Sequence, residues 1–251
     1  WVSDAGEGVK IAVVGEAAWI QEWTPPLPGA AVQGAVHNDL ENVILEGSAI
    51  SLPDVTMDFN DEAAAARCTA VLGVLAATDN DFGVTGLAHE ATTYFFPTRS
   101  VPVPGGGPVS RIDDAFLNAI NLLSPGDVLV VAMQPNAPNG FALNDIEIAT
   151  YIQNAAQNDI HVVLPAGDYG VGLPGDLSDV PGIANMSIVA GAVPGSESNY
   201  MRWWSSNYSD TDTVNAASAG GANLCAWGGM VTTTGGNANL TVLTYPGGID
   251  A

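Results

Sequence analysis

The sequence contains few histidines and cysteines, the side chains that most often act as a general base or as a reactive thiol in catalysis. Its three histidines are His37, His89 and His161, and none of them adjoins a Gly-x-Ser-x-Gly motif or another nucleophile signature. Its two cysteines, Cys68 and Cys225, do not have the spacing of a metal site and are too few for a disulfide framework. We interpret the histidines as surface or loop residues, and the cysteines as either two buried thiols or one bridge.

The charge balance excludes several classes of partner. The 251 residues include 27 Asp and Glu against 5 Lys and Arg, which gives a formal net charge of −22. Because such a chain repels phosphate backbones and anionic lipids, we expect no nucleic-acid partner and no membrane partner. No apolar run reaches the roughly 20 residues that span a bilayer.

The composition also favours an extracellular protein. Lysine is scarce, and the chain holds 29 Gly and 16 Pro. We therefore predict a soluble protein that is secreted or extracellular. Three N-x-S/T sequons begin at Asn185, Asn207 and Asn239. They matter only in a host that glycosylates secreted chains.

The elements that must position any site alternate between strands and helices. Short β-branched segments predict strands at residues 9–14, 43–46, 92–97, 127–133, 161–165 and 187–193. The Ala-rich stretch 61–77 opens with acidic residues, as a helix N-terminus favours, and apolar residues at three- and four-residue spacing predict helices at 111–123 and 143–158. This alternation is typical of a mostly parallel sheet covered by helices. We predict one doubly wound α/β domain over residues 1–251.

Five segments, in this order, resemble the subtilisin-like serine proteases. They are 8–14 (GVKIAVV), 69–86 (TAVLGVLAATDNDFGVTG), 162–170 (VVLPAGDYG), 187–205 (SIVAGAVPGSESNYMRWWS) and 223–235 (NLCAWGGMVTTTG). The first is similar to the strand that ends at that family's catalytic Asp, and the second to the helix that begins at its catalytic His. The third is similar to the strand before the Asn that binds the oxyanion. The resemblance covers most of the chain and implies the subtilisin-like three-layer α/β architecture.

The positions that match the family's catalytic residues hold different residues here. Gly15, with Glu16 beside it, stands where the family has Asp, and Arg67 stands where it has His. Asp168 replaces the oxyanion Asn, and Ile249 lies at or near the nucleophile position. A guanidinium stays protonated and cannot act as a general base. The resemblance therefore leads us to predict a pseudoprotease, a catalytically inactive domain that acts as a binding or structural protein.

Two alternatives to this prediction remain open. The first is an active peptidase or other hydrolase with a relocated catalytic centre, in which Glu16 or Asp168 does the acid–base work. The second is a glycan- or peptide-binding module that uses the old substrate cleft, with aromatic side chains on its walls. The candidate aromatic residues are Trp19, Trp23, Trp203, Trp204 and Trp227.

The resemblance places Glu16, Arg67 and Asp168 close together. One guanidinium between two carboxylates forms a charge-assisted cluster. Such a cluster is either an ion network that fills a former active site, or a binding site in which Arg67 grips a carboxylate or a sulfate. An arginine at this position is notable because the chain has only 5 Lys and Arg.

The resemblance also implies a Ca²⁺ site. The segment 78–84 (TDNDFGV) is similar to the family's calcium loop. The implied oxygen ligands are Asp39, Asn80 and the carbonyl groups of Thr78, Phe82 and Val84, all of the hard type that calcium prefers. The alternative is an ordinary acidic turn.

The sequence ends at Ala251, where the resembled fold begins a long buried helix. A doubly wound sheet without that helix would expose an apolar groove, which soluble monomers rarely tolerate. We therefore expect either a second polypeptide chain that completes the fold, as in a processed heterodimer, or an unusual arrangement that closes the groove.

Overall fold

The computed structural model describes most of the chain in separate stretches. They are residues 5–20, 36–47, 55–81, 83–102, 106–173, 177, 180–193, 201–202, 205–209, 224–227, 232–234 and 242–244. The chain divides into two compact units. The first comprises residues 1–123, 232–244 and 251, and the second comprises 124–231 and 245–250.

The first unit is built on three parallel strands. The strand β4 (Thr92–Pro97) lies between β1 (Lys10–Gly15) and β2 (Ile44–Leu45), with Gly15 opposite Pro97 and Ile44 opposite Tyr94. The residues of β1 are almost all buried, as expected for a parallel strand covered on both faces. These strands confirm the predicted strands at 9–14, 43–46 and 92–97 to within about two residues.

Two helices belong to the first unit. In α1 (Glu62–Ala76), the side chain of Asp61 caps the N-terminus by accepting a hydrogen bond from the backbone N–H of Ala64. Two acidic residues open α2 (Ile112–Leu122), where they complement the positive end of the helix dipole. Both helices lie within one residue of the predicted bounds 61–77 and 111–123. The acidic residues at the start of 61–77 indicated α1, and the spacing of apolar residues indicated α2.

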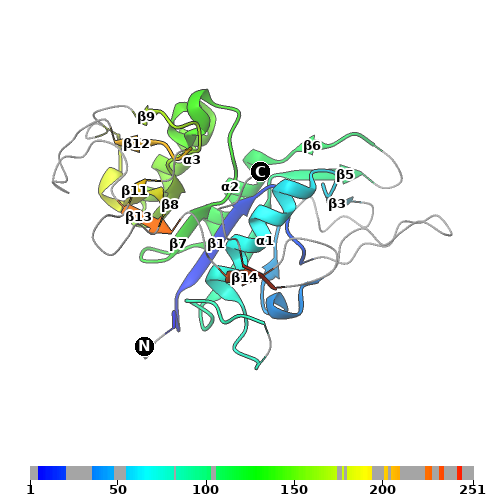
Figure 1. Ribbon diagram of the computed structural model, residues 1–251. Helices are drawn as coiled ribbons and strands as arrows, with labels where there is room; N and C mark the ends of the chain where they lie inside the picture. The colour runs from blue at the N-terminus through cyan, green and yellow to red at the C-terminus, as the bar shows by residue number, and fades with distance from the viewer. Residues whose placement is uncertain are drawn as a thin grey trace. The chain divides into compact units, whose positions relative to one another are not determined.

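Two small antiparallel sheets in this unit were not predicted. One joins β3 (Val55–Met57), β5 (Arg99–Pro102) and β6 (Val109–Ser110), and the other pairs β14 (Thr232–Thr234) with β15 (Val242–Thr244). These strands have two to four residues each, too few to show an alternating pattern. The strand β14 lies against α1 (Figure 1), where the hydroxyl groups of Thr233 and Thr234 donate to the carbonyl groups of Ala70 and Thr69.

The second unit contains a parallel group of four strands. The strand β8 (His161–Pro165) pairs with β7 (Val128–Val131) on one side and β10 (Met186–Val193) on the other, and β13 (Leu224–Trp227) pairs with β10. The short β11 (Met201–Arg202) adds to β10 in the antiparallel sense, and β9 (Gly172–Leu173) pairs with β12 (Tyr208–Ser209). The predicted strands at 127–133, 161–165 and 187–193 are confirmed.

The helix α3 (Ile146–Gln157) also belongs to the second unit. The carboxylate of Asp145 caps its N-terminus by accepting hydrogen bonds from the backbone N–H groups of Glu147 and Ile148. The observed helix begins three residues after the predicted start at residue 143, because residues 142–144 form a separate 3-10 turn. None of the helices among the described residues has the length and apolar character that crossing a membrane requires.

Candidate functional site

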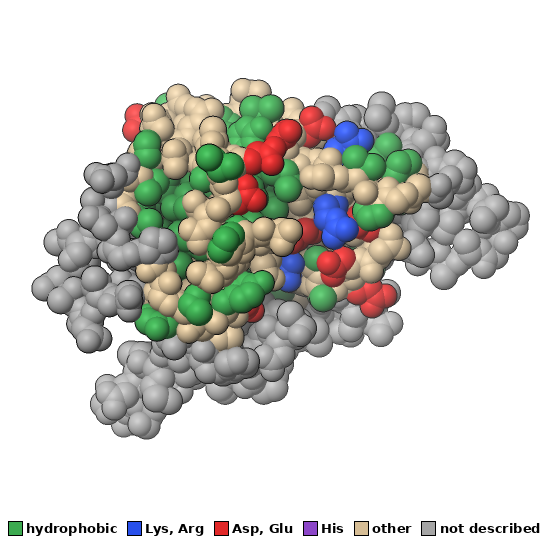
Figure 2. Space-filling model, turned by 90° about the horizontal axis from the view of Figure 1, so that it is seen from above, with side chains coloured by type: hydrophobic (Ala, Val, Ile, Leu, Met, Phe, Trp, Pro, Cys, Tyr) green, Lys and Arg blue, Asp and Glu red, His purple; other side chains and the backbone are tan. Residues whose placement is uncertain are grey.

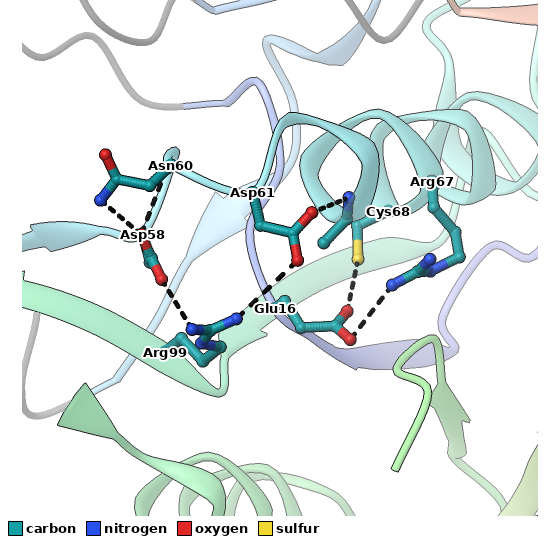
Figure 3. A network of polar contacts seen from close by, with 8 residues as sticks. Glu16, Asp58, Asn60, Asp61, Arg67, Cys68 and Arg99 are labelled. Atoms are coloured by element: carbon teal, nitrogen blue, oxygen red, sulfur yellow. Dashed lines mark hydrogen bonds and ion pairs between the residues drawn. The ribbon is translucent and has the colours of Figure 1, made fainter. Parts of the chain in front are cut away.

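Glu16 and Arg67 meet at the carboxyl end of β1. Glu16 directly follows this strand, and Arg67 lies in the second turn of α1. The Nη2 atom of Arg67 is 3.2 Å from Oε1 of Glu16, and Sγ of Cys68 is 3.6 Å from Oε2 of the same carboxylate (Figure 3). The side chain of Glu16 is 11% exposed and that of Arg67 is 24% exposed. One carboxylate is therefore held from two sides, and its guanidinium partner still reaches solvent.

Local hydrogen bonds fix the two segments that carry this pair. The hydroxyl of Thr69 accepts the backbone N–H of Trp19 at 2.9 Å and donates to the carbonyl of Ala65 at 2.7 Å. The carbonyl of Gly15 accepts the N–H of Thr98 at 2.7 Å. Thr69 thus ties the segment after β1 to α1, so that Glu16 faces the helix turn of Arg67.

Cys68 is a thiol and is fully buried. Burial, and after it the negative charge of Glu16, raise the pKa of the Cys68 thiol from 9.0 to about 12. A thiol with such a pKa remains protonated at neutral pH and is a poor nucleophile. Its role at this site is to donate a weak hydrogen bond to Glu16. The side chain of Cys225 lies outside the described residues. Because Cys68 is a free thiol, the structure supports the alternative without a bridge between the two cysteines.

A second ion cluster lies at the start of α1. Arg99 is 3.2 Å from the buried carboxylate of Asp58 and 3.8 Å from that of Asp61. Asp58 also accepts hydrogen bonds from the backbone and side-chain amides of Asn60 (Figure 3). On the face shown in Figure 2, the few basic side chains lie beside acidic ones. Arg67 and Arg99 each lie beside a carboxylate that balances their positive charge.

Asp168 belongs to the second unit, where it follows β8 and is exposed. The predicted cluster comprises Glu16, Arg67 and Asp168. The first unit contains the ion pair between Glu16 and Arg67, and Asp168 lies in the second unit. Ile249 and Phe82 lie outside the described residues, as do Trp23, Trp203 and Trp204.

The remaining aromatic candidates give no support to a binding surface. Trp19 is buried and its ring stacks on that of Phe59, with centroids 5.0 Å apart. The side chain of Trp227 lies outside the described residues. The burial of Trp19 removes this residue from the proposed wall of a glycan site.

Asn207 holds the loop that carries Asp168, and the sequence did not single it out for this role. Its side-chain amide donates to the carbonyl groups of Asn139 and Ala166 at 2.7 and 2.9 Å, and its Oδ1 accepts the N–H groups of Tyr169 and Val171, both at 3.1 Å. Asn207 is completely buried, and both of its amide hydrogens are used. A glycan at this sequon would replace one of these two donor hydrogens, inside a side chain that is completely buried.

In the implied calcium site, one oxygen atom, Oδ1 of Asp39, is suited to bind the ion. Asp39 is completely buried and its Oδ2 accepts the N–H of Val84 at 3.0 Å, whereas its Oδ1 has no hydrogen-bond donor among the described residues. The backbone N–H of Thr78 donates to the carbonyl of Asp39 at 2.8 Å, which places residue 78 beside this aspartate. A buried carboxylate oxygen without a donor is a suitable ligand for a hard cation. Among the described residues, no group of three His, Cys, Asp or Glu side chains could hold a metal ion. Besides the carboxylate of Asp39, a cation here would therefore depend on carbonyl and amide oxygens.

Comparison with known proteins assigns the fold. No family model matches the chain. The major intracellular serine protease of Bacillus subtilis (strain 168) is 27% identical over 184 residues, which cover 68% of this chain and 52% of that protein. The chain thus spans about half of the length of this relative. A structure of a psychrophilic protease superimposes on 98% of this chain and 74% of its own with a TM-score of 0.62, at 20% identity.

The fold is subtilisin-like, an α/β architecture with a mostly parallel sheet. A second solved structure, a cold-adapted subtilisin-like serine proteinase, covers 98% of this chain and 72% of its own with a TM-score of 0.55, at 13% identity. The predicted fold class is confirmed, and so is the resemblance to the subtilisin-like serine proteases that the five sequence segments carry. The replacement of the family's catalytic residues at Gly15, Arg67, Asp168 and Ile249 stays a prediction from the sequence.

The comparisons correct the predicted function. The sequence analysis predicts a catalytically inactive binding or structural protein, but each similar protein named above is a protease. The prediction of a pseudoprotease is therefore wrong, and the alternative of an active peptidase agrees better with these relatives. The departures of single positions from the family's motifs do not outweigh the likeness of most of the chain to proteases.

Proposed function

We propose that this chain forms a subtilisin-like peptidase domain whose catalytic centre is relocated to the Glu16–Arg67 pair. The fold is that of proteases, and the pair lies at the carboxyl end of β1, the edge at which open α/β sheets bind ligands. The observation that carries the proposal is the 3.2 Å contact between Arg67 and a nearly buried glutamate. The substrate class is the peptide bond.

In this proposal, Glu16 is the general base. Its carboxylate takes a proton from a water molecule, and the resulting hydroxide attacks the carbonyl carbon of the peptide bond. The carbonyl oxygen gains a negative charge as the new C–O bond forms. Glu16 then returns the proton to the leaving amine when the C–N bond breaks.

Arg67 stabilises the negative charge that develops on the carbonyl oxygen. Its guanidinium is partly exposed and carries five N–H donors, of which one is directed at Glu16 in the 3.2 Å contact. A cationic donor placed at a developing oxyanion commonly contributes a factor of about 10²–10³ in turnover. Because the arginine also holds Glu16, one residue positions the base and stabilises the product of the attack.

A peptidase assay on pure protein tests this proposal. We expect cleavage of an internally quenched peptide library, and a loss of about 100-fold or more in turnover in Glu16→Gln, which keeps the shape of the side chain but cannot accept a proton. Arg67→Lys keeps the charge and should retain more activity than Arg67→Met. Asp114→Asn, which alters only the 3.7 Å surface pair with Arg111, is the matched control and should change nothing. Absence of cleavage by the native protein, or full activity of Glu16→Gln, would refute the proposal.

We also propose that Ca²⁺ stabilises the first unit. Asp39 would provide a carboxylate oxygen, and Asn80, Thr78 and Val84 would complete the set of hard oxygen ligands, with Phe82 as the remaining predicted ligand. The support is the buried Oδ1 of Asp39, which has no donor among the described residues. The ion would act on stability by joining η1 (Asn38–Leu40) to the loop after α1. Secretion and a second polypeptide chain remain predictions from the sequence.

A further inference from the structure

We propose that Ser187 and His161 form a separate nucleophilic site that accepts acyl groups from small activated esters. The Nε2 atom of His161 lies 2.8 Å from Oγ of Ser187, the distance of a hydrogen bond. His161 is exposed and Ser187 is partly exposed, so that both groups can meet a solute. A hydroxyl that is hydrogen-bonded to an imidazole is the arrangement that activates a serine nucleophile.

The sheet fixes both backbones of this pair. His161 is the first residue of β8 and Ser187 the second of β10, and these strands pair in parallel with Met186 opposite Val162 and Ser187 opposite Val163. The N–H of His161 also donates to the carbonyl of Asp127 at 2.9 Å. The serine and the imidazole therefore come from adjacent rigid strands, and their contact does not depend on a loop.

The pair lies at the end of β8 opposite to Asp168. His161 begins this five-residue strand and Asp168 follows its carboxyl end. At a rise of about 3.3 Å per residue, the length of the strand alone separates the two positions by more than about 13 Å. The pair is thus distinct from the loop that Asn207 holds, and its residues take no part in the proposed Glu16–Arg67 centre.

Two acidic residues lie near the pair of His161 and Ser187. Asp127 and Asp159 lie on the same edge, where the carboxylate of Asp127 accepts the N–H of Ser124 at 2.8 Å and that of Asp159 accepts the side-chain amide of Asn185 at 3.4 Å. Among the described residues, Nδ1 of His161 has no hydrogen-bond partner, so the imidazole is a base without an orienting carboxylate.

The reaction is an acyl transfer. Oγ of Ser187 attacks the carbonyl carbon of the ester while its proton passes to Nε2 of His161, and the new C–Oγ bond replaces the bond to the leaving alcohol. The leaving group departs with the bonding electron pair, as p-nitrophenolate from p-nitrophenyl acetate. The imidazolium then loses its proton to the solvent. Water attacks the carbonyl carbon of the acyl-serine while Nε2 takes a proton from it, and the imidazolium returns that proton to Oγ of Ser187 as the C–Oγ bond breaks and the carboxylic acid is released. No other reactant is needed.

Covalent labelling tests the site. We expect a fluorophosphonate probe to form one adduct on Ser187, located by mass spectrometry of chymotryptic peptides, and p-nitrophenyl acetate to give a burst of about one equivalent. Ser187→Ala should abolish the adduct, and His161→Gln should slow labelling about 100-fold, because glutamine can hydrogen-bond to the serine but cannot take its proton. Ser124→Ala, which removes an exposed serine hydroxyl on the same edge, is the matched control and should label normally.

Two results would overturn the proposal. They are an adduct on another residue, and unchanged labelling in Ser187→Ala or His161→Gln. The test is independent of the proposed peptidase function, because Glu16→Gln should retain the label on Ser187 whereas Ser187→Ala should retain peptide cleavage. A protein that labels but does not cleave peptides would support the ester site and refute the peptidase centre.

Discussion

The sulfur of Cys68 occupies the space beside Gly15 that any larger residue at position 15 would need. A Cβ atom added to Gly15 would lie 2.6 Å from Sγ of Cys68 and 3.2 Å from the ring of Phe95. The strand β1 and the helix α1 approach so closely here because position 15 has no side chain. This approach brings Sγ within 3.6 Å of the carboxylate of Glu16. The close packing of Cys68 against β1 therefore depends on a glycine at position 15.

Gly15→Ala should destabilise the protein by about 1–3 kcal/mol, because the added methyl group overpacks a buried contact. The double variant Gly15→Ala with Cys68→Ala should recover much of this loss, since the sulfur is then absent. Urea unfolding followed by circular dichroism measures both. Gly107→Ala is the control, because a Cβ there meets nothing within 4 Å, and it should change stability by less than about 0.5 kcal/mol. Equal losses in the single and double variants would contradict the coupling.

The free energy of unfolding should fall at alkaline pH because of Cys68. Its pKa is about 12 in the folded protein against 9.0 in the reference state, so between these values the folded form holds a proton that the unfolded form has lost. The stabilisation is complete below pH 9.0 and is lost as the pH rises toward about 12, at about 1.4 kcal/mol per pH unit. Cys68→Ser removes this titration. Denaturant unfolding at several pH values should give a steeper alkaline decline for the native protein than for the variant, and parallel declines would exclude this role.

Removal of Arg67 should destabilise the protein more than removal of its partner. In Arg67→Met the nearly buried carboxylate of Glu16 loses its cation, which should cost about 1–3 kcal/mol. Glu16→Gln leaves a neutral side chain that can still accept a hydrogen bond, so it should cost less. A double-mutant cycle should give a coupling energy of about 1 kcal/mol, reduced by the partial exposure of Arg67. A coupling energy of zero would mean that the contact adds nothing to stability.

Calcium should raise the melting temperature if Asp39 holds the ion. At a free concentration 100 times the Kd, binding to the folded form stabilises by about 2.7 kcal/mol. Differential scanning calorimetry in calcium and in EDTA measures the difference, which Asp39→Asn should abolish. Asp79→Asn is a matched control in the same loop, because this exposed side chain accepts only the hydroxyl of Thr85 at 3.4 Å. Identical melting with calcium and with EDTA would refute the site.

Asn207→Ala should destabilise the second unit by about 2–4 kcal/mol, because the four hydrogen bonds of a completely buried side chain are lost together. The loop of residues 166–171 should then exchange its amide hydrogens faster, which hydrogen-exchange mass spectrometry can measure. The control is Asn144→Ala, which loses one exposed hydrogen bond to the carbonyl of Pro138. Native exchange rates in the Asn207 variant would show that other contacts hold this loop.

The local pattern of the sequence was enough to predict the main elements. Thr92–Pro97 and His161–Pro165 are strands within the predicted bounds, and the helices differ by one to three residues at their ends. These segments are long enough for side-chain periodicity to show which face is buried. The short strands of the two small antiparallel sheets, β3, β5, β6, β14 and β15, escaped prediction because their hydrogen-bond partners, not their own residues, create them.

The sequence by itself determined the charge, the order of strands and helices, and the likeness to a protease fold. The family resemblance also predicted that Glu16 and Arg67 lie close together, whereas only the tertiary structure decided which of their atoms meet and that Ser187 contacts His161. Glu16 and Arg67 are 51 residues apart in the chain, and Ser187 and His161 are 26 apart. Their contacts depend on how strands and helices return to the same place, which no local pattern encodes. Hydrophobic periodicity reports the burial of a residue, whereas the partner of a polar side chain is set by the register and packing of distant segments.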